Sequence, residues 1–329
     1  MDFGKLSPAE LQTAKLTLPC EPEWNKQILS GSPAASPKVY VGCAKWGRTE
    51  WVGKIYPEGT KEARFLDHYV EHYNSIELNA THYKTYPPEG IQKWADKAQG
   101  RDFLFCPKVP KSISHFSTFV NIDDKTNAFL EGILAFGEHL GPVFLQVSDK
   151  FSPKRKESLL NYLESLPKDI QFFLEVRNPD WFVSGGESSN LLKRLNEMNI
   201  GYVITDTAGR RDCAHMYLTV SKAFIRFVGN SLDPSDYLRI DDWVNRIKYW
   251  LDNGLEELYF FMHMHDEAYS PELSVYLIDK LNEVCGLSLQ KPVFISEIEA
   301  KTSIKGTTPG KVVASKKTST AEIDLFSKG

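Results

Sequence analysis

The chain has 329 residues, of which 42% are hydrophobic and 12% aromatic, and its formal net charge at pH 7 is -4. This length suits one large domain or two ordinary ones, and the small charge carries no general signal for nucleic acid or membrane surfaces. No apolar run approaches the roughly 20 residues of a membrane helix, and no signal peptide is recognisable. Five scattered cysteines without a C-x-x-C pair indicate neither a disulfide framework nor a cysteine zinc site. We therefore expect a cytoplasmic protein without a membrane segment.

The first part of the chain, residues 1–37, is predicted to be an N-terminal extension. Residues 7–15 carry a weak helix signal, since a serine cap is followed by proline in the first turn. Residues 30–37, SGSPAASP, have the composition of a linker. The pattern of a folded domain begins after this run, and we expect that domain to occupy residues 38–295.

Strand-like apolar runs alternate with helix-like amphipathic runs through the predicted domain. The strands are predicted at 39–43, 74–79, 103–107, 142–147, 171–176, 201–205, 223–228 and 257–263. The helices are predicted at 61–73, 88–98, 124–138, 154–166, 189–198, 241–253 and 272–285. Eight strands with helical crossovers predict an α/β fold, a (β/α)8 barrel of the TIM type. An open doubly wound sheet is the alternative, but no glycine-rich phosphate loop follows the first strand.

The last part of the chain, residues 296–329, is predicted to be a disordered basic tail. Residues 300–320 contain five lysines and no acidic residue, among Gly, Ser, Thr and Pro. The segment 322–326, EIDLF, looks like the bacterial sliding-clamp binding motif, with Glu where Gln is usual. The alternative is a chance sequence in a disordered tail.

Polar residues occur at the ends of all eight predicted strands. In a barrel of this kind the chemistry lies there, because the loops after the strands cluster at one end. The catalytic candidates carry acid or base groups and are Glu77, Lys108, Glu175 and Asp206. The ligand-binding candidates at the same ends are Lys45, Trp46, Asn79, Gln146, Arg177 and Arg226.

Acids and bases together favour a small polar ligand with an anionic or polyhydroxyl part. Lys108, Arg177 and Arg226 are suited to hold a phosphate or carboxylate. The alternative is structural: Glu175 pairs with a basic neighbour, and Asp206 caps the turn that follows it.

Two histidines at the end of the last strand are candidates for a divalent metal site. His263 and His265 are two residues apart and so share one face of the strand. Glu175 or Asp206 would complete the ligand shell. The alternative is a neutral, hydrogen-bonding pair of histidines at the mouth of the site.

Several segments together resemble the domain of unknown function 72 family, whose members are YecE-like proteins. The resemblance covers roughly residues 38–285 and is carried by VGCAKW, SIELNATHYKTYP, FLFCPKVPKSISH, GPVFLQ and LEVRNPDWF. It implies a TIM-barrel-like fold, and it brings no established reaction. It also places Tyr83, His115 and Trp181 on family motif positions, which adds them to the ligand-binding candidates.

Two hypotheses about function follow from these patterns. The first is a barrel enzyme, a hydrolase, lyase or isomerase, acting on a phosphorylated or sugar-like substrate. The second is a nucleic-acid-processing accessory protein, tethered to the sliding clamp through residues 300–329, with the tail lysines touching phosphates.

Overall fold

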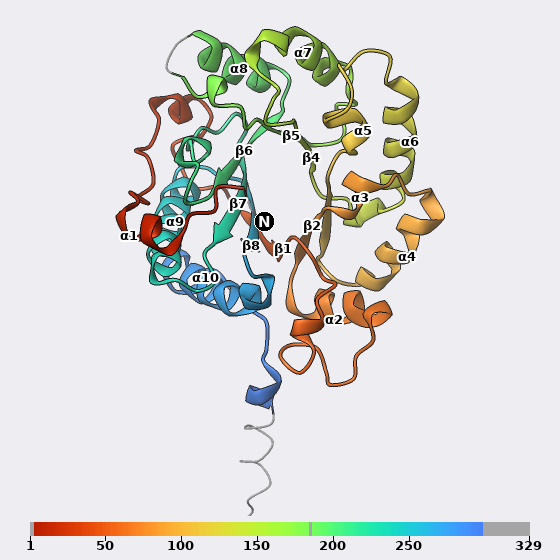
Figure 1. The fold of residues 1–329 in the computed structure, drawn as a ribbon, viewed down its shortest axis with the longest axis vertical. Coiled ribbons are helices and arrows are strands. Elements are labelled where there is room, and N and C mark those ends of the chain that lie inside the picture. The colour runs from red at the N-terminus through yellow and green to blue at the C-terminus, as the bar shows by residue number, and fades with distance from the viewer. Residues whose placement is uncertain (1–2, 184–185, 299–329) are drawn as a thin grey trace, which may run out of the picture.

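Eight parallel strands form a nearly closed barrel with helices around its outside (Figure 1). The computed structural model describes residues 3–183 and 186–298. The strands are β1 Lys38–Cys43, β2 Ser75–Leu78, β3 Leu104–Pro107, β4 Val143–Gln146, β5 Phe172–Glu175, β6 Gly201–Asp206, β7 Lys222–Gly229 and β8 Glu257–Met264. All eight predicted strand positions and the (β/α)8 fold are confirmed.

The helices of the described chain are close to the predicted ones. They are α1 Pro8–Thr13, α2 Phe65–His72, α3 Ala80–Tyr83, α4 Pro88–Ala98, α5 Lys111–Ser114, α6 Asp123–Leu134, α7 Lys156–Ser165, α8 Gly186–Glu197, α9 Pro234–Asp252 and α10 Ser270–Cys285. Helix α9 begins two turns before the predicted start, because the Asp233 side chain caps it by accepting from the Ser235 amide. The short helices α3 and α5 directly follow β2 and β3 and were not predicted.

The hydrogen-bonded ladder runs from β3 through β1 and β8 to β4, and the barrel closes between β3 and β4. There the Val109 amide donates to the Phe144 carbonyl at 3.0 Å, and the Gly141 amide donates to the Phe105 carbonyl at 2.8 Å. Lys108 pairs with Phe144 in an isolated parallel bridge at the same place. The closing seam therefore fixes the backbone of Lys108 on the inner wall of the barrel.

Aromatic side chains fill the inside of the barrel. One buried cluster there contains Tyr40, Phe144, Phe173, Phe224, Tyr259 and Phe261. Successive residues of a strand point to opposite faces, so the residue two positions further on faces the same way. Glu175 follows Phe173 by two positions, and Arg226 follows Phe224 by two. The sequence therefore stacks a charged layer directly above an aromatic one, at the C-terminal ends of the strands.

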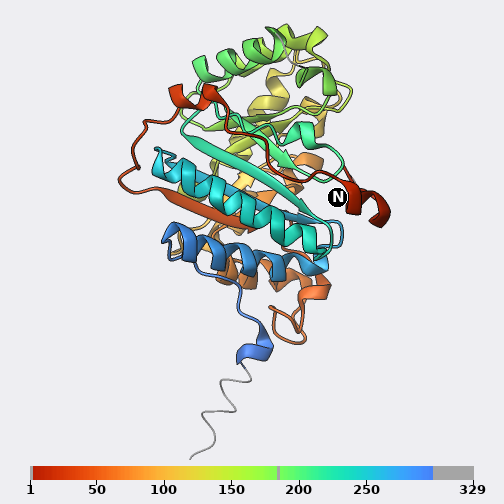
Figure 2. The same cartoon turned by 90° about the vertical axis from the view of Figure 1, so that its left-hand side faces the viewer.

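The N-terminal extension packs along the side of the barrel, past α9, and reaches the end where the strands finish (Figure 2). Near its junction with β1 the Gly31 amide donates to the Asn253 carbonyl at 2.9 Å. Further back the Trp24 indole donates to the Leu218 carbonyl at 2.7 Å. At the far end the Gly209 amide donates to the Gly4 carbonyl at 2.8 Å. The extension is thus hydrogen-bonded along its length.

Two further predictions concern the whole chain. None of the helices in residues 3–183 and 186–298 is both long enough and apolar enough to cross a membrane. Most of the predicted tail, including the EIDLF segment at 322–326, lies outside the described residues.

Candidate functional site

A buried arginine on β7 is the centre of the charged layer. Arg226 donates from Nε and Nη2 to the two oxygens of Glu77, each at 2.7 Å, and from Nη1 to Glu175 Oε2 at 2.7 Å. None of the three side chains is more than 1% exposed. One guanidinium thus links carboxylates from β2 and β5 across the barrel, in the two-pronged geometry that arginine forms best with carboxylates.

The two glutamates have further donors that complete their hydrogen bonding. Asn79 and His263 both donate to Glu77, at 2.8 and 2.9 Å. Arg177 Nε and Thr205 Oγ1 both donate to Glu175 Oε1, at 2.6 and 2.9 Å.

These contacts set the pKa of both carboxyl groups. Burial alone would raise the pKa of Glu175, but the charges of Arg177, Arg226 and Lys108 lower it to about 2. Burial is likewise outweighed at Glu77, where Arg226 and His263 hold the pKa well below its usual value. A carboxylate that is so acidic and so fully hydrogen-bonded is a weak general base.

Lys108 is the group in the layer whose pKa suits proton transfer. Its side chain is 7% exposed, and Nζ donates to Gln146 Oε1 at 2.7 Å and lies 5.7 Å from the Phe144 ring centre. Burial lowers its pKa most, the charge of Arg226 adds to this, and the pKa falls to about 7. At neutral pH this amine therefore exchanges protons readily, unlike an ordinary lysine.

Two more basic side chains converge on Lys108. Arg177 is 6% exposed, and its Nη2 atom is buried without a hydrogen-bond partner among the residues that the structure describes. Burial lowers the pKa of His115, and the nearby charges of Lys108 and Arg177 lower it further. The charged layer thus contains two carboxylates and three basic side chains, Lys108, Arg177 and Arg226. Its net charge is therefore positive when Lys108 is protonated.

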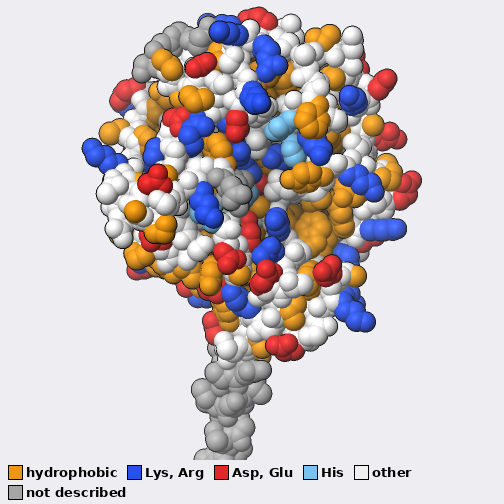
Figure 3. Space-filling model, in the orientation of Figure 1, with side chains coloured by type: hydrophobic (Ala, Val, Ile, Leu, Met, Phe, Trp, Pro, Cys, Tyr) orange, Lys and Arg blue, Asp and Glu red, His pale blue; other side chains and the backbone are white. Residues whose placement is uncertain are grey.

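The remaining ligand-binding candidates from β1 and β2 lie at the rim. Lys45, Trp46, Asn79 and Tyr83 line a pocket of about 250 Å³, together with Glu77 from the layer beneath. Tyr83 is 70% exposed. Figure 3 shows this face of the barrel, with basic and apolar side chains side by side around a hollow. A ligand in this pocket would meet a largely apolar wall above a charged floor.

Two predicted site residues do not join this arrangement. Trp181 is 1% exposed and donates its indole N–H to the Phe151 carbonyl at 2.8 Å, so it is a packed residue of the outer core. Asp206 faces the opposite side of β6 from Thr205, toward α9. Its carboxylate accepts from Arg239 at 2.8 Å and from the Trp243 indole at 2.6 Å, and it pairs with Arg211.

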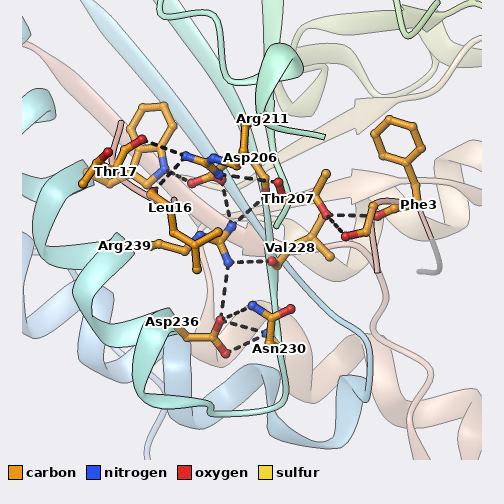
Figure 4. Close-up of polar contacts among 12 residues, drawn as sticks. Phe3, Leu16, Thr17, Asp206, Thr207, Arg211, Val228, Asn230, Asp236 and Arg239 are labelled. Atoms are coloured by element: carbon orange, nitrogen blue, oxygen red, sulfur yellow. Dashed lines mark hydrogen bonds and ion pairs between the residues drawn. The ribbon is translucent and has the colours of Figure 1, made fainter. Parts of the chain in front are cut away.

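The contacts of Asp206 form a second buried network, which ties the N-terminal extension to the barrel (Figure 4). Arg211 also donates to the Leu16 carbonyl at 2.9 Å. Arg239 donates to the Val228 carbonyl at 3.0 Å and lies 3.4 Å from Asp236. The chemistry of Asp206 is therefore that of a structural anchor between β6, α9 and the extension.

Replacing Asp206 by asparagine is expected to lower the free energy of unfolding by about 1.5–3 kcal/mol. The change keeps the side-chain shape but removes the charge that accepts from two arginines and an indole, and hydrogen bonds to charged groups are worth about that much. Urea denaturation measures the effect, with the exposed Asp169→Asn as the matched control. A loss below about 0.5 kcal/mol, the level of ordinary surface substitutions, would contradict the anchor role.

The two metal candidates at the end of β8 contact different groups. His263 is 2% exposed and binds Glu77 inside the barrel. His265 lines a separate surface pocket with Lys5 and Leu6. Within residues 3–183 and 186–298 no group of three or more His, Cys, Asp or Glu side chains is placed to hold a metal ion. The predicted metal site thus gains no support from the geometry.

Sequence reasoning missed three residues that shape the layer. Thr205 binds Glu175, and strand alternation would have placed it inward, since Val203 lies in the interior cluster. Phe144 lies beneath the charged layer, 5.4 Å from the Arg226 guanidinium. Phe3 stacks on Arg177 at 4.0 Å, and no sequence signal predicts a contact between residues so far apart.

The fold and this layer define the class of the protein: a (β/α)8 barrel with a buried ionic network at the C-terminal ends of its strands. The chain belongs to the DUF72 family, described as "Protein of unknown function DUF72", which matches residues 40–293. The resemblance seen in the sequence is therefore confirmed.

Relatives and solved structures agree with this assignment. UPF0759 protein YecE of Escherichia coli (strain K12) is 28% identical over an alignment of 253 residues, and the match covers 71% of this chain and 89% of YecE. UPF0759 protein YunF of Bacillus subtilis (strain 168) is 27% identical over an alignment of 151 residues, and the match covers 44% of this chain and 52% of YunF. A DUF72 family protein from Enterococcus faecalis V583 has a TM-score of 0.57 and 17% identity, covering 78% of this chain and 100% of its own. A DUF72 family protein from Thermotoga maritima MSB8 has a TM-score of 0.55 and 21% identity, and the match covers 76% of this chain and 100% of that protein's chain.

Proposed function

We propose that the barrel mouth binds a small ligand through a phosphate or carboxylate group, held by Lys108 and Arg177. One observation carries the proposal: both cations are buried at the mouth of the barrel, and neither uses all of its hydrogen-bond donors. In the described chain Lys108 donates only to a neutral amide, and one Arg177 nitrogen has no partner. Burying a charge is costly unless it is paired or used, so an anion at this place would offset that cost.

Lys108 is also the group proposed to exchange a proton with the ligand. Its pKa of about 7 matches the requirement for general acid–base catalysis at neutral pH. Glu77 and Glu175 serve instead to hold Arg226 and Arg177 in place. This division favours proton transfer next to an anionic group, as in an isomerase or lyase, over hydrolysis with a glutamate as base. The pocket beside Trp46 and Tyr83 would take the less polar part of the ligand.

Sulfate is a suitable probe because it remains a dianion between pH 6 and 9. Its affinity is expected to be highest below about pH 7 and to fall as the pH rises above 7, because Lys108 then loses its proton in the free protein. Lys108 interacts with Glu77, Glu175, Arg177 and Arg226. The pKa values of the two glutamates are lowered and that of Arg226 is raised, so these three groups keep their charges over this range, and burial lowers the pKa of the neighbouring His115.

Isothermal titration of sulfate at constant ionic strength measures the profile. Absence of sulfate binding at pH 6.5 would overturn the proposed function. A sulfate affinity that does not change between pH 6 and 9 would show that Lys108 does not bind the anion. The tethering function considered from the tail sequence stays a prediction, since residues 322–326 are outside the described part of the chain.

A further inference from the structure

The N-terminal extension brings an aromatic side chain to the proposed anion site. The family matches residues 40–293, so the extension precedes the part of the chain that the family shares. Even so, the Phe3 ring lies 4.0 Å from the centre of the Arg177 guanidinium and 5.3 Å from that of Arg210. A cation over the face of an aromatic ring at these distances is attracted by it.

Hydrogen bonds fix the backbone on both sides of this contact. Thr207 Oγ1 donates to the Phe3 carbonyl at 3.0 Å, and the Gly209 amide donates to the Gly4 carbonyl at 2.8 Å. Gly4 has a φ of 68°, and a Cβ there would collide with the Thr207 side chain. Figure 4 shows Phe3 beside Thr207, with Arg211 and its partners Leu16 and Thr17 on the other side of Thr207. The ring is therefore positioned by the loop that follows β6.

The stacking leaves the in-plane donors of Arg177 for other partners. A guanidinium donates its hydrogen bonds in its own plane, and Arg177 makes no hydrogen bond to the Phe3 ring, which it contacts with its central carbon 4.0 Å from the ring centre. Arg177 Nε already donates to Glu175, and Arg210 donates to the Arg177 carbonyl at 2.6 Å. The guanidinium is thus bound by Glu175 at Nε and contacts the Phe3 ring, while Nη2 has no partner in the described structure.

We propose that Phe3 is a positioning residue of the anion site, supplied by the N-terminal extension and not by the barrel. By holding the guanidinium plane and keeping water from one face, it presents the unpaired donor of Arg177 to the ligand anion. This inference rests on the proposed function, since it assigns Phe3 a role in that same site.

Sulfate titration at pH 6.5 tests the inference on the full chain. Phe3→Ala is expected to weaken sulfate binding about three- to tenfold, and Phe3→Tyr, which keeps a ring, to bind like wild type. Gly4→Ala, which displaces the segment, should weaken binding as Phe3→Ala does. The exposed Gln12→Ala in α1 is the matched control and should have no effect.

A double-mutant cycle separates positioning from a general structural role. In an Arg177→Gln background, Phe3→Ala should change sulfate affinity less than twofold, because Phe3 acts through that arginine. The inference about Phe3 is wrong if wild type and Phe3→Ala bind sulfate equally, or if Phe3→Ala weakens binding by the same factor in the wild-type and Arg177→Gln backgrounds. Neither result contradicts the proposed function. Absence of sulfate binding by wild type overturns the proposed function and the inference with it.

Discussion

Replacing Arg226 by methionine is expected to lower the free energy of unfolding by about 3–5 kcal/mol, the largest stability effect of any substitution discussed for this protein. The methionine keeps much of the side-chain volume but leaves Glu77 and Glu175 facing each other without their shared cation. Removing one partner of a buried ion pair costs about this much, since the remaining charge is buried without compensation. Urea denaturation at pH 7 measures the difference from wild type.

The dependence on pH distinguishes this mechanism from simple loss of packing. In wild type the Glu175 pKa of about 2 lies below its usual 4.5, so its contribution is present above pH 4.5 and is lost as the pH falls toward 2. Without Arg226 the pKa of Glu77 would rise, because burial is the largest influence on it and Arg226 is the largest charge that opposes burial, whereas Glu175 keeps Arg177. Protonation of Glu77 would then remove the buried charge that has lost its partner. The deficit of the variant should therefore shrink between pH 7 and pH 5.

The matched control is Lys248→Met, which breaks an ion pair whose side chains are 41% and 52% exposed and should cost less than about 1 kcal/mol. A deficit for Arg226→Met that stays constant from pH 7 to pH 5 would contradict the buried-charge explanation.

Replacing Lys108 by methionine is expected to reduce sulfate affinity at pH 6.5 at least tenfold while leaving the fold as stable as wild type or more so. The side chain is buried, its pKa is lowered mainly by that burial, and no carboxylate forms a direct ion pair with it in the described chain. An apolar side chain of similar length removes the desolvation cost of the amine, and such replacements are often neutral or stabilising. The substitution is thus expected to lower sulfate affinity without lowering the free energy of unfolding.

Calorimetric titration and urea denaturation of the same preparation test both parts. Lys45→Met, at an exposed rim position that also lines the pocket, is the control and should weaken binding far less. If Lys108→Met bound sulfate with wild-type affinity, Lys108 would not be part of the anion site. Loss of several kcal/mol of stability would instead identify Lys108 as a structural cation.

Much of the fold was predictable because strand and helix periodicities in a (β/α)8 barrel are local. The strands are buried on both faces and read as short apolar runs, with polar residues such as Glu77 and Gln146 at or near their C-terminal ends. The ends of parallel strands meet at one end of the barrel, which is why these side chains could be expected to converge. The start of α9 was missed because a capping aspartate outside the apolar pattern sets it.

The pairing within the site could not be read from the sequence. Whether a strand-end residue faces the barrel or its helices depends on alternation, and Asp206 falls one position after the inward-facing Thr205. The roles of the glutamates changed for a related reason. Glu175 and Glu77 were general acid–base candidates, but Arg226 from a strand far along the chain binds both and makes them weak bases. Lys108 is the better candidate for proton transfer because burial lowers its pKa, and that burial exists only in the folded protein.

The pKa of Lys108 itself tests the central claim most directly. Nuclear magnetic resonance of the lysine side-chain Cε, assigned with the Lys108→Met variant, follows its titration with and without sulfate. The account predicts a pKa near 7 in the free protein and a clear rise when sulfate binds, because an adjacent anion favours the charged amine. A pKa that does not change when saturating sulfate is present would show that the anion does not reach Lys108, and the proposed site would be wrong.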